Sequence, residues 1–101
     1  MRVFDWQVSS WFLFEHQEHY YLDVNCSIGA FGYSFMLKMT DDESRAYSQS
    51  GYCYLQQLAQ AIAQSAPIAE NSSSAYRERA VSSKLSDLAA EAFLLWKSAR
   101  Q

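Results

Sequence analysis

YSFMLKMTDDE, residues 33–43, is the stretch that decides the fold of this chain. Its apolar residues alternate with others up to residue 39, which is the period of a β-strand. Beyond residue 43 the apolar residues recur every three or four positions, as they do on one face of an α-helix. Thr40 and Glu43 have the spacing of a capping box, in which each side chain bonds the backbone amide of the other residue. The stretch therefore predicts a strand that leads directly into a helix.

Two more strand regions precede this junction. The first covers residues 2–15, which is long for one strand, so we expect a bend or bulge near Ser9-Ser10. Residues 16–19 are polar and predict a hairpin turn, residues 20–27 alternate as a second strand, and residues 33–40 form the third. Sequential strands with short connections favour an antiparallel meander in the order 1-2-3.

Two helices are predicted after the strands. The first spans residues 41–65, with a kink near Ser48–Gly51, and ends before Pro67. The second spans residues 82–100, and residues 76–81 before it read equally as extended or helical. Its apolar stripe, with Phe93 and Leu94 beside it, comprises Leu85, Leu88, Ala89, Ala92, Leu95, Trp96 and Ala99. The prediction is therefore a single α+β domain of residues 1–101, a three-stranded antiparallel meander followed by a long helix and a C-terminal helix (β-β-β-α-α).

The sheet is expected to be covered on both sides. Residues 11–14 are apolar at both odd and even positions, so both faces of the first strand region need cover. Helix 41–65 would pack on one face, and the C-terminal helix of the same chain or of a second chain would cover the other face or the edge of the sheet. The predicted core comprises Phe12, Leu22, Val24, Phe35, Leu37, Leu55, Leu58, Ile62, Leu88, Leu95 and Trp96.

Charge and composition narrow the class of partner. The chain has 101 residues and a net charge of −3, and the basic residues of its C-terminal third alternate with acidic ones. A nucleic-acid interface needs basic residues clustered without acids, so we expect no nucleic-acid binding. No stretch approaches the ~20 apolar residues of a membrane span, and the N-terminus has no secretion signal. The sequence predicts a cytoplasmic protein without membrane contact, in which Cys26 and Cys53 are reduced. Its small size and acidic charge fit many small bacterial domains.

Two groups of histidine and acidic residues could in principle bind a metal ion. Glu15, His16, Glu18 and His19 form the densest group, but zinc hydrolases need two histidines at positions i and i+4 on a helix, and here they are at i and i+3 at a hairpin tip. The acids at 41–43 are explained by the electrostatics of a helix start. The sequence contains no nucleophile elbow and no phosphate-binding loop. We therefore predict no catalytic residue, no metal site and no cofactor, and favour a function other than catalysis.

Aromatic residues suggest recognition of a protein. They make up 16% of the chain and are concentrated in the strands, and such residues are enriched at the centres of interfaces. The candidate partner-binding surface comprises Trp11, Tyr21, Asp23, Asn25 and Tyr33. The leading hypothesis is a small acidic protein-interaction module, such as an inhibitor or immunity-type protein. The alternatives are a structural homo-oligomer, for example a homodimer, and a divergent metal-dependent enzyme that uses His16 and His19 or the acids at 5, 23 and 41–43.

Overall fold

The computed structural model describes residues 1–7, 10–28, 31–65, 79 and 81–99. The described elements, in chain order, are β1 (Arg2–Gln7), β2 (Trp11–His16), β3 (His19–Ile28), β4 (Phe31–Lys38), α1 (Asp41–Ser50), α2 (Tyr52–Ser65) and α3 (Ser83–Ala99). The strands form one antiparallel sheet in the order β1-β2-β3-β4. The α+β class and the sequential meander are as predicted. No helix within the described ranges combines the length and apolar character needed to cross a membrane.

The predicted three strands are four, because the first strand region is a hairpin. Its chain reverses between β1 and β2, where Gln7 pairs with Trp11 and the amide of Ser10 donates to the carbonyl of Gln7 at 3.0 Å. Near this turn an even-numbered residue pairs with an even-numbered one, as Trp6 does with Phe12. Paired residues share a face of the sheet. A reversal between Gln7 and Trp11 therefore leaves the same alternation of side chains as a bent single strand, which is what we predicted, while Ser9 lies outside the described residues.

A β-bulge does occur in this region, but within β1. The register shifts between Val3 and Asp5. Phe4 and Asp5 both contact Tyr47 of α1, the former by ring packing and the latter by accepting a hydrogen bond from the Tyr47 hydroxyl at 2.9 Å. Val3 belongs to the cluster under α3. The extra residue places the consecutive side chains of Phe4 and Asp5 on the same side of the sheet, and it breaks the regular edge of the sheet.

The turn between β2 and β3 is a two-residue hairpin. His16 pairs with His19, and the two residues between them, Gln17 and Glu18, have φ values of 51° and 67°. Two consecutive positive φ angles match the twist of a hairpin, as in a type I′ turn. Glycine and asparagine adopt positive φ angles readily, whereas other residues do so at a cost in free energy. Gln17 and Glu18 are therefore unfavourable residues for this turn.

The predicted long helix is broken into two helices rather than kinked. Gly51 has φ 64° and ψ −144°, and its amide donates to the carbonyl of Tyr47, which ends α1. A residue with positive φ cannot continue a right-handed helix, so α2 starts afresh at Tyr52. At the other end of α1, the capping box is present as predicted: Thr40 Oγ1 accepts from the amide of Glu43 at 3.1 Å, and Glu43 Oε1 accepts from the amide of Thr40 at 2.8 Å.

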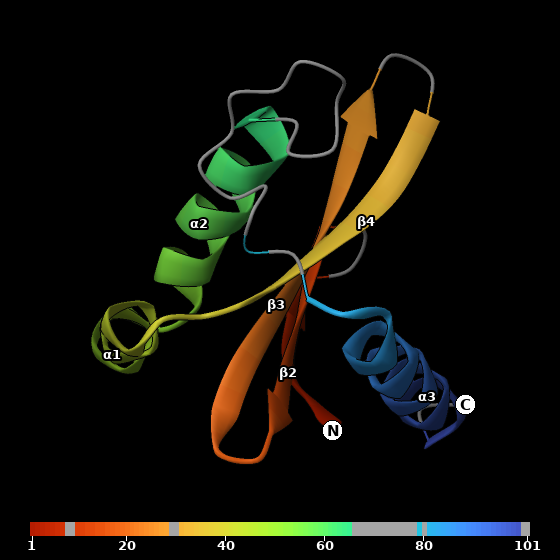
Figure 1. The fold of residues 1–101 in the computed structure, drawn as a ribbon. Coiled ribbons are helices and arrows are strands. Elements are labelled where there is room, and N and C mark those ends of the chain that lie inside the picture. The colour runs from red at the N-terminus through yellow and green to blue at the C-terminus, as the bar shows by residue number, and fades with distance from the viewer. Residues whose placement is uncertain (8–9, 29–30, 66–78, 80, 100–101) are drawn as a thin grey trace.

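The sheet lies between helical layers, with α1 and α2 on one side and α3 on the other (Figure 1). Two buried clusters result, one between the sheet and α2 and the other between the sheet and α3. Of the predicted places for the C-terminal helix, which were the other face or the edge of the sheet in the same or a second chain, the structure shows the other face in the same chain. Of the predicted core, the following residues are buried: Leu22, Val24, Phe35, Leu37, Leu55, Leu58 and Ile62.

The orientation of α3 about its axis differs from the prediction. Leu95 was expected in the core and is 73% exposed, while Phe12, Leu88 and Trp96 are half-buried. Phe93, which we placed beside the stripe, packs on Phe12 with ring centroids 5.2 Å apart. Trp96 also packs on Phe12, at 5.2 Å, and on Trp6, at 5.1 Å. The small residues Ala89 and Ala92 let the helix approach the sheet, and aromatic contacts with β1 and β2 fix its rotation.

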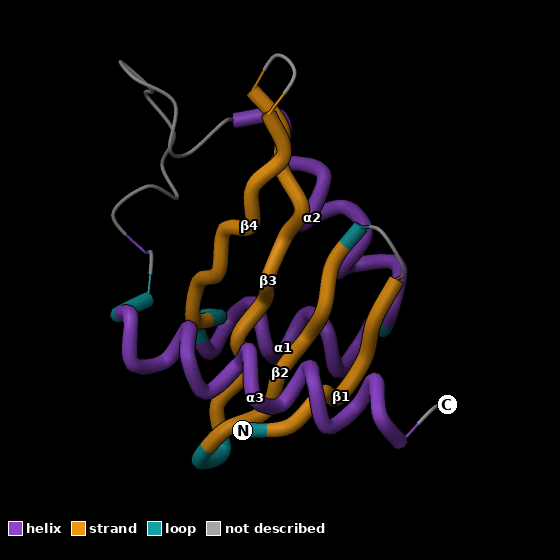
Figure 2. The backbone as a smooth tube through the Cα atoms, turned by 90° about the vertical axis from the view of Figure 1, so that its right-hand side faces the viewer, coloured by secondary structure: helices purple, strands orange, loops and turns teal. Residues whose placement is uncertain are grey.

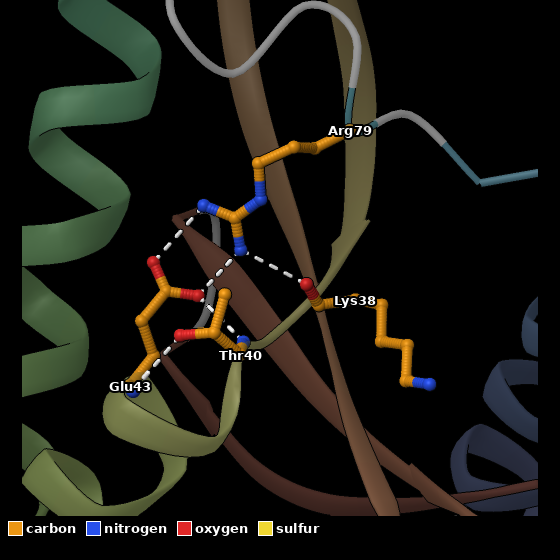
Figure 3. A network of polar contacts seen from close by, with 4 residues as sticks. All are labelled: Lys38, Thr40, Glu43 and Arg79. Carbon is orange, nitrogen blue, oxygen red and sulfur yellow. Dashed lines mark hydrogen bonds and ion pairs between the residues drawn. The ribbon is translucent and has the colours of Figure 1, made fainter.

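Arg79 links the segment before α3 to the start of α1 (Figure 3). Its Nη1 donates to Glu43 Oε2 at 3.1 Å, and its Nη2 donates to Glu43 Oε1 and, at 2.9 Å, to the carbonyl of Lys38. Burial opposes the charged form of Glu43, but the hydrogen bonds from Arg79 and Thr40 outweigh it and hold the Glu43 pKa below its ordinary 4.5. Two residues on, the amide of Val81 donates to the carbonyl of Met36 at 3.1 Å, so this segment follows the β4 edge.

Replacing Glu18 with glycine in the β2–β3 turn should stabilise the fold. Glycine accepts positive φ without steric cost, so we expect Glu18→Gly to raise the free energy of unfolding by about 1 kcal/mol. Urea denaturation followed by tryptophan fluorescence measures the change. The matched control is Gln57→Gly on the exposed face of α2, which should lower stability by about 1 kcal/mol because glycine is a poor helix former. Equal effects of the two substitutions would contradict the assigned turn conformation.

Removing the Arg79 guanidinium should destabilise the protein. We expect Arg79→Met to cost about 1–3 kcal/mol at neutral pH, because it leaves the half-buried Glu43 carboxylate without its charged partner. Since the folded-state pKa of Glu43 is lowered, the contribution of the pair is present above pH 4.5 and disappears as the pH falls through that lowered pKa. Urea denaturation at neutral and acidic pH tests this. Arg45→Met, which breaks an exposed pair with Asp42, should change stability by no more than about 0.5 kcal/mol.

Candidate functional site at the sheet–α3 interface

The residues proposed from the sequence as one binding surface lie on two sides of the sheet. Trp11 and Tyr33 belong to the α2 side, and Trp11 is fully buried there, with its Nε1 donating to Gln56 Oε1 at 3.4 Å. Tyr21, Asp23 and Asn25 are on the α3 side, where Tyr21 is buried and Asn25 is exposed. The structure therefore brings together only Asp23 and Asn25 at an accessible position.

Asp23 lines a pocket of about 380 Å³ between the sheet and α3. In the sheet it pairs with Phe12 on β2 and with Met36 on β4, so apolar side chains flank it on both neighbouring strands. From α3, Ala89, Ala90 and Phe93 complete the lining. Figure 2 shows that α3 crosses the end of the sheet that carries the β2–β3 turn, and that the β3–β4 hairpin extends past the helix at the other end.

The Asp23 carboxyl group is in an unfavourable environment for a charge. Its Oδ1 is buried and accepts no hydrogen bond from any described residue. Burial raises the Asp23 pKa from 3.8 to about 6. Buried carboxylates are ordinarily paired with a cation or with hydrogen-bond donors, so this group is an exception that a purely structural role does not explain. Perturbed carboxyl groups in pockets are typical of functional sites.

The polar residues of the pocket lie at one end of it. Asn25 and Ser34 are paired across β3 and β4, two residues along the strands from the Asp23–Met36 pair, and Ser86 of α3 lines the same pocket. All three are exposed, whereas Phe14 at the opposite end is buried. The sequence placed Asp23 among aromatic residues, but could not reveal the pocket, because the helix that closes it is separated from β3 by about sixty positions in the chain.

A second accessible feature lies on the outer surface of α3. Leu94 and Leu95 are 62% and 73% exposed, the highest values among the large apolar residues of the described chain. Beside them, a groove of about 260 Å³ is lined by Ala92, Leu95 and Trp96 and, from the start of the chain, by Met1, Arg2 and Val3, so it is apolar except at Arg2. Adjacent exposed leucines next to an apolar groove are typical of a contact surface, whereas single exposed apolar residues need no explanation.

The residues considered for metal binding are not assembled into a site. Within the residues that the structure describes, no three His, Cys, Asp or Glu side chains are placed to hold one ion. Asp5 accepts from Tyr47 on the α2 side, and Asp23 is on the α3 side, so the sheet separates them. Glu43 is bound to Arg79 and Thr40. The acids at 5, 23 and 41–43 therefore have separate surroundings. The cysteines are free thiols, with Cys26 buried and Cys53 exposed.

Asp23→Asn should stabilise the protein in a pH-dependent way. The difference between 3.8 and about 6 corresponds to a cost of about 3 kcal/mol for ionising Asp23 in the folded state. Because the folded-state pKa is raised, this cost is absent below pH 3.8, grows between 3.8 and about 6, and is complete above. We expect Asp23→Asn to raise the free energy of unfolding relative to the wild type, and this gain to be about 2–3 kcal/mol larger at neutral pH than at pH ~3. Urea denaturation at both values measures this, with Asp87→Asn, an exposed acid on α3, as the unaffected control.

No protein family, curated protein or solved structure matches this chain. Two places in the fold have the geometry of a binding site, namely the pocket at Asp23 and the outer surface of α3.

Proposed function

We propose that this protein is a small, acidic, non-enzymatic protein-interaction module that binds a partner through the outer surface of α3. The observation that carries the proposal is the exposure of Leu94 and Leu95 next to the groove formed with Met1, Val3 and Trp96. Burying a leucine side chain contributes about 1.5–3 kcal/mol, so the two leucines provide enough free energy to anchor an interface. The packing of the described residues leaves both leucine side chains exposed.

The surroundings of the leucines have the composition of an interface rim. Glu91 and Lys97 of α3, each within about one helical turn of the leucines, are exposed, as is Asp87 a turn earlier. Interfaces commonly have an apolar centre surrounded by polar and charged residues. The partner that fits is a protein with a complementary apolar patch, and the net charge of −3 favours a partner with a basic surface. An inhibitor or immunity-type protein, which acts by covering an enzyme or toxin, would use such a surface.

The groove extends the apolar centre beyond the helix. The groove continues from Leu95 and Trp96 onto Met1, which precedes β1, and onto Arg2 and Val3, the first two residues of that strand. Trp96 is held by Trp6 and Phe12, so this part of the surface is rigid before binding. A preformed surface loses little conformational entropy on association, which favours specific binding. The same features would also support self-association, in which the partner is a second copy of the chain.

A double substitution tests the surface. We expect Leu94→Gln with Leu95→Gln to weaken partner binding by at least about tenfold, since it removes the apolar centre, and to change stability by less than about 1 kcal/mol, since both side chains are exposed. The measurement is affinity capture from a lysate of the source organism, with quantitative mass spectrometry and light scattering of the eluate. The matched control is Gln57→Asn with Gln64→Asn, two exposed positions of α2 on the other side of the sheet.

The outcomes separate the alternatives. A stoichiometric partner that is captured by the wild type and by the control, but not by the double leucine variant, supports the proposal. A dimer of the wild type that the leucine substitutions convert to a monomer favours the structural homo-oligomer. Binding that is equal for all three proteins contradicts the proposed surface.

A further inference from the structure

The pocket under α3 is graded from apolar to polar along the strands. The register places Phe14 and Tyr21 in one row across the sheet, Phe12, Asp23 and Met36 in the next, and Asn25 and Ser34 in the third. Successive rows on one face are separated by two residues along each strand. A ligand that extends along β3 would therefore meet aromatic side chains, then a carboxyl group, and then an amide and a hydroxyl.

Asp23 is the one titratable side chain among the described residues that line the pocket. The strands β2 and β4 and the helix α3 present to it Phe12, Phe14, Ser34, Met36, Ser86 and Phe93, besides two alanines. The described charged or titratable residues of these elements outside the lining are Glu15, His16, Tyr33, Lys38, Lys84, Asp87, Glu91 and Lys97. On β3 itself, burial and, to a smaller extent, the charge of Asp23 raise the pKa of the Cys26 thiol, so this thiol stays neutral.

We propose that this pocket is a binding site for a small amphipathic amine, with the ammonium group on Asp23 and an aromatic or short aliphatic group against Phe12 and Phe93. The buried Oδ1 of Asp23 has no donor from the described residues, and an ammonium group would supply both the hydrogen bond and the opposite charge. This inference concerns a surface other than the one in the proposed function, and each can fail without the other.

The charge of the ligand follows from the state of the carboxyl group. With a pKa of about 6, Asp23 is mostly ionised at neutral pH, in a pocket whose other described lining residues carry no charge. A buried, unpaired charge is unfavourable. The attraction of a cation that enters the pocket offsets part of the free energy that the carboxylate loses on dehydration. An anionic ligand would add repulsion, and an uncharged one would leave the carboxylate unpaired.

The size and shape of the ligand follow from the lining. A volume of about 380 Å³ is at the lower end of the ~300–1,000 Å³ that small-molecule pockets span. Phe12 and Phe93 meet edge to face, with an angle of 85° between their planes, and this arrangement offers contacts for an aromatic ring as well as for the carbon next to a cation. Asn25 and Ser34 can bond a further polar substituent on the ligand.

Phenethylamine tests the proposal, with 2-phenylethanol and 3-phenylpropanoate as neutral and anionic analogues. Binding is followed by chemical-shift changes in ¹H–¹⁵N spectra of the full chain at pH ~7.5, where Asp23 is ionised. We expect phenethylamine to bind with a Kd on the order of 1 mM or tighter, as is typical of a ligand this small, and to shift the amides of Asp23, Ala89 and Ala90. The alcohol should bind at least about tenfold more weakly, and the carboxylate should not bind measurably.

Two variants and a change of pH test whether phenethylamine binding depends on the charge of Asp23 and on the space in this pocket. Asp23→Asn should weaken phenethylamine binding at least about tenfold while the protein remains folded, and Ala90→Leu should block the pocket sterically. Asp87→Asn, an exposed acid outside the lining, should leave the affinity unchanged. Lowering the pH from ~7.5 to ~5 should weaken binding about tenfold, because protonation removes the Asp23 charge.

Three results would overturn the proposal. They are the absence of shifts at ~10 mM phenethylamine, equal affinity for the amine and the alcohol, and unchanged amine binding in Asp23→Asn. Loss of partner binding in the Leu94 and Leu95 variant has no bearing on these readouts, because neither leucine lines this pocket.

Discussion

The structure depends on a sheet that is apolar on both faces at β2. Trp11 and Leu13 point to one side and Phe14 to the other, and all three are buried. Such a strand is stable only between two covering layers. The helices α2 and α3 provide them, and the remaining features of the fold serve this sandwich: the Gly51 break lets α2 start in a new direction, and Arg79 fixes the chain at the β4 edge before it enters α3.

The same constraint gives Asp23 its unusual environment. On a sheet with one solvated face, an acid at this position would be hydrated and its pKa would be ordinary. Because α3 covers that face, the carboxyl group is buried next to Phe12 and Met36, and ionisation is disfavoured. Local rules are most often broken at functional sites, where stability is sacrificed for binding. This physical conflict directs attention to the pocket rather than to the exposed residues of the loops.

Much of the fold could be predicted from local patterns. The strands around β3 and β4, the junction at Thr40, the capping box with Glu43 and the extent of α3 each depend on residues close together in the chain. Two errors came from contacts between distant residues. The hairpin between β1 and β2 keeps the parity of a bent strand, so alternation alone could not distinguish them. The rotation of α3 depends on Phe12 and Trp6, which packing places against Phe93 and Trp96.

The sequence by itself determined the spacing of apolar residues in the strands and helices, the capping box of α1 and the need for a covering layer on each face of the sheet. These features follow from the geometry of strands and helices over a few residues. Only the tertiary structure decided which residues share a site. It buried Trp11 and Tyr21, placed Asp23 under α3 and left Leu94 and Leu95 outside. The physical reason is that the pattern of α3 offers apolar residues over a wide arc, and the aromatic side chains of the sheet select which part of that arc is buried.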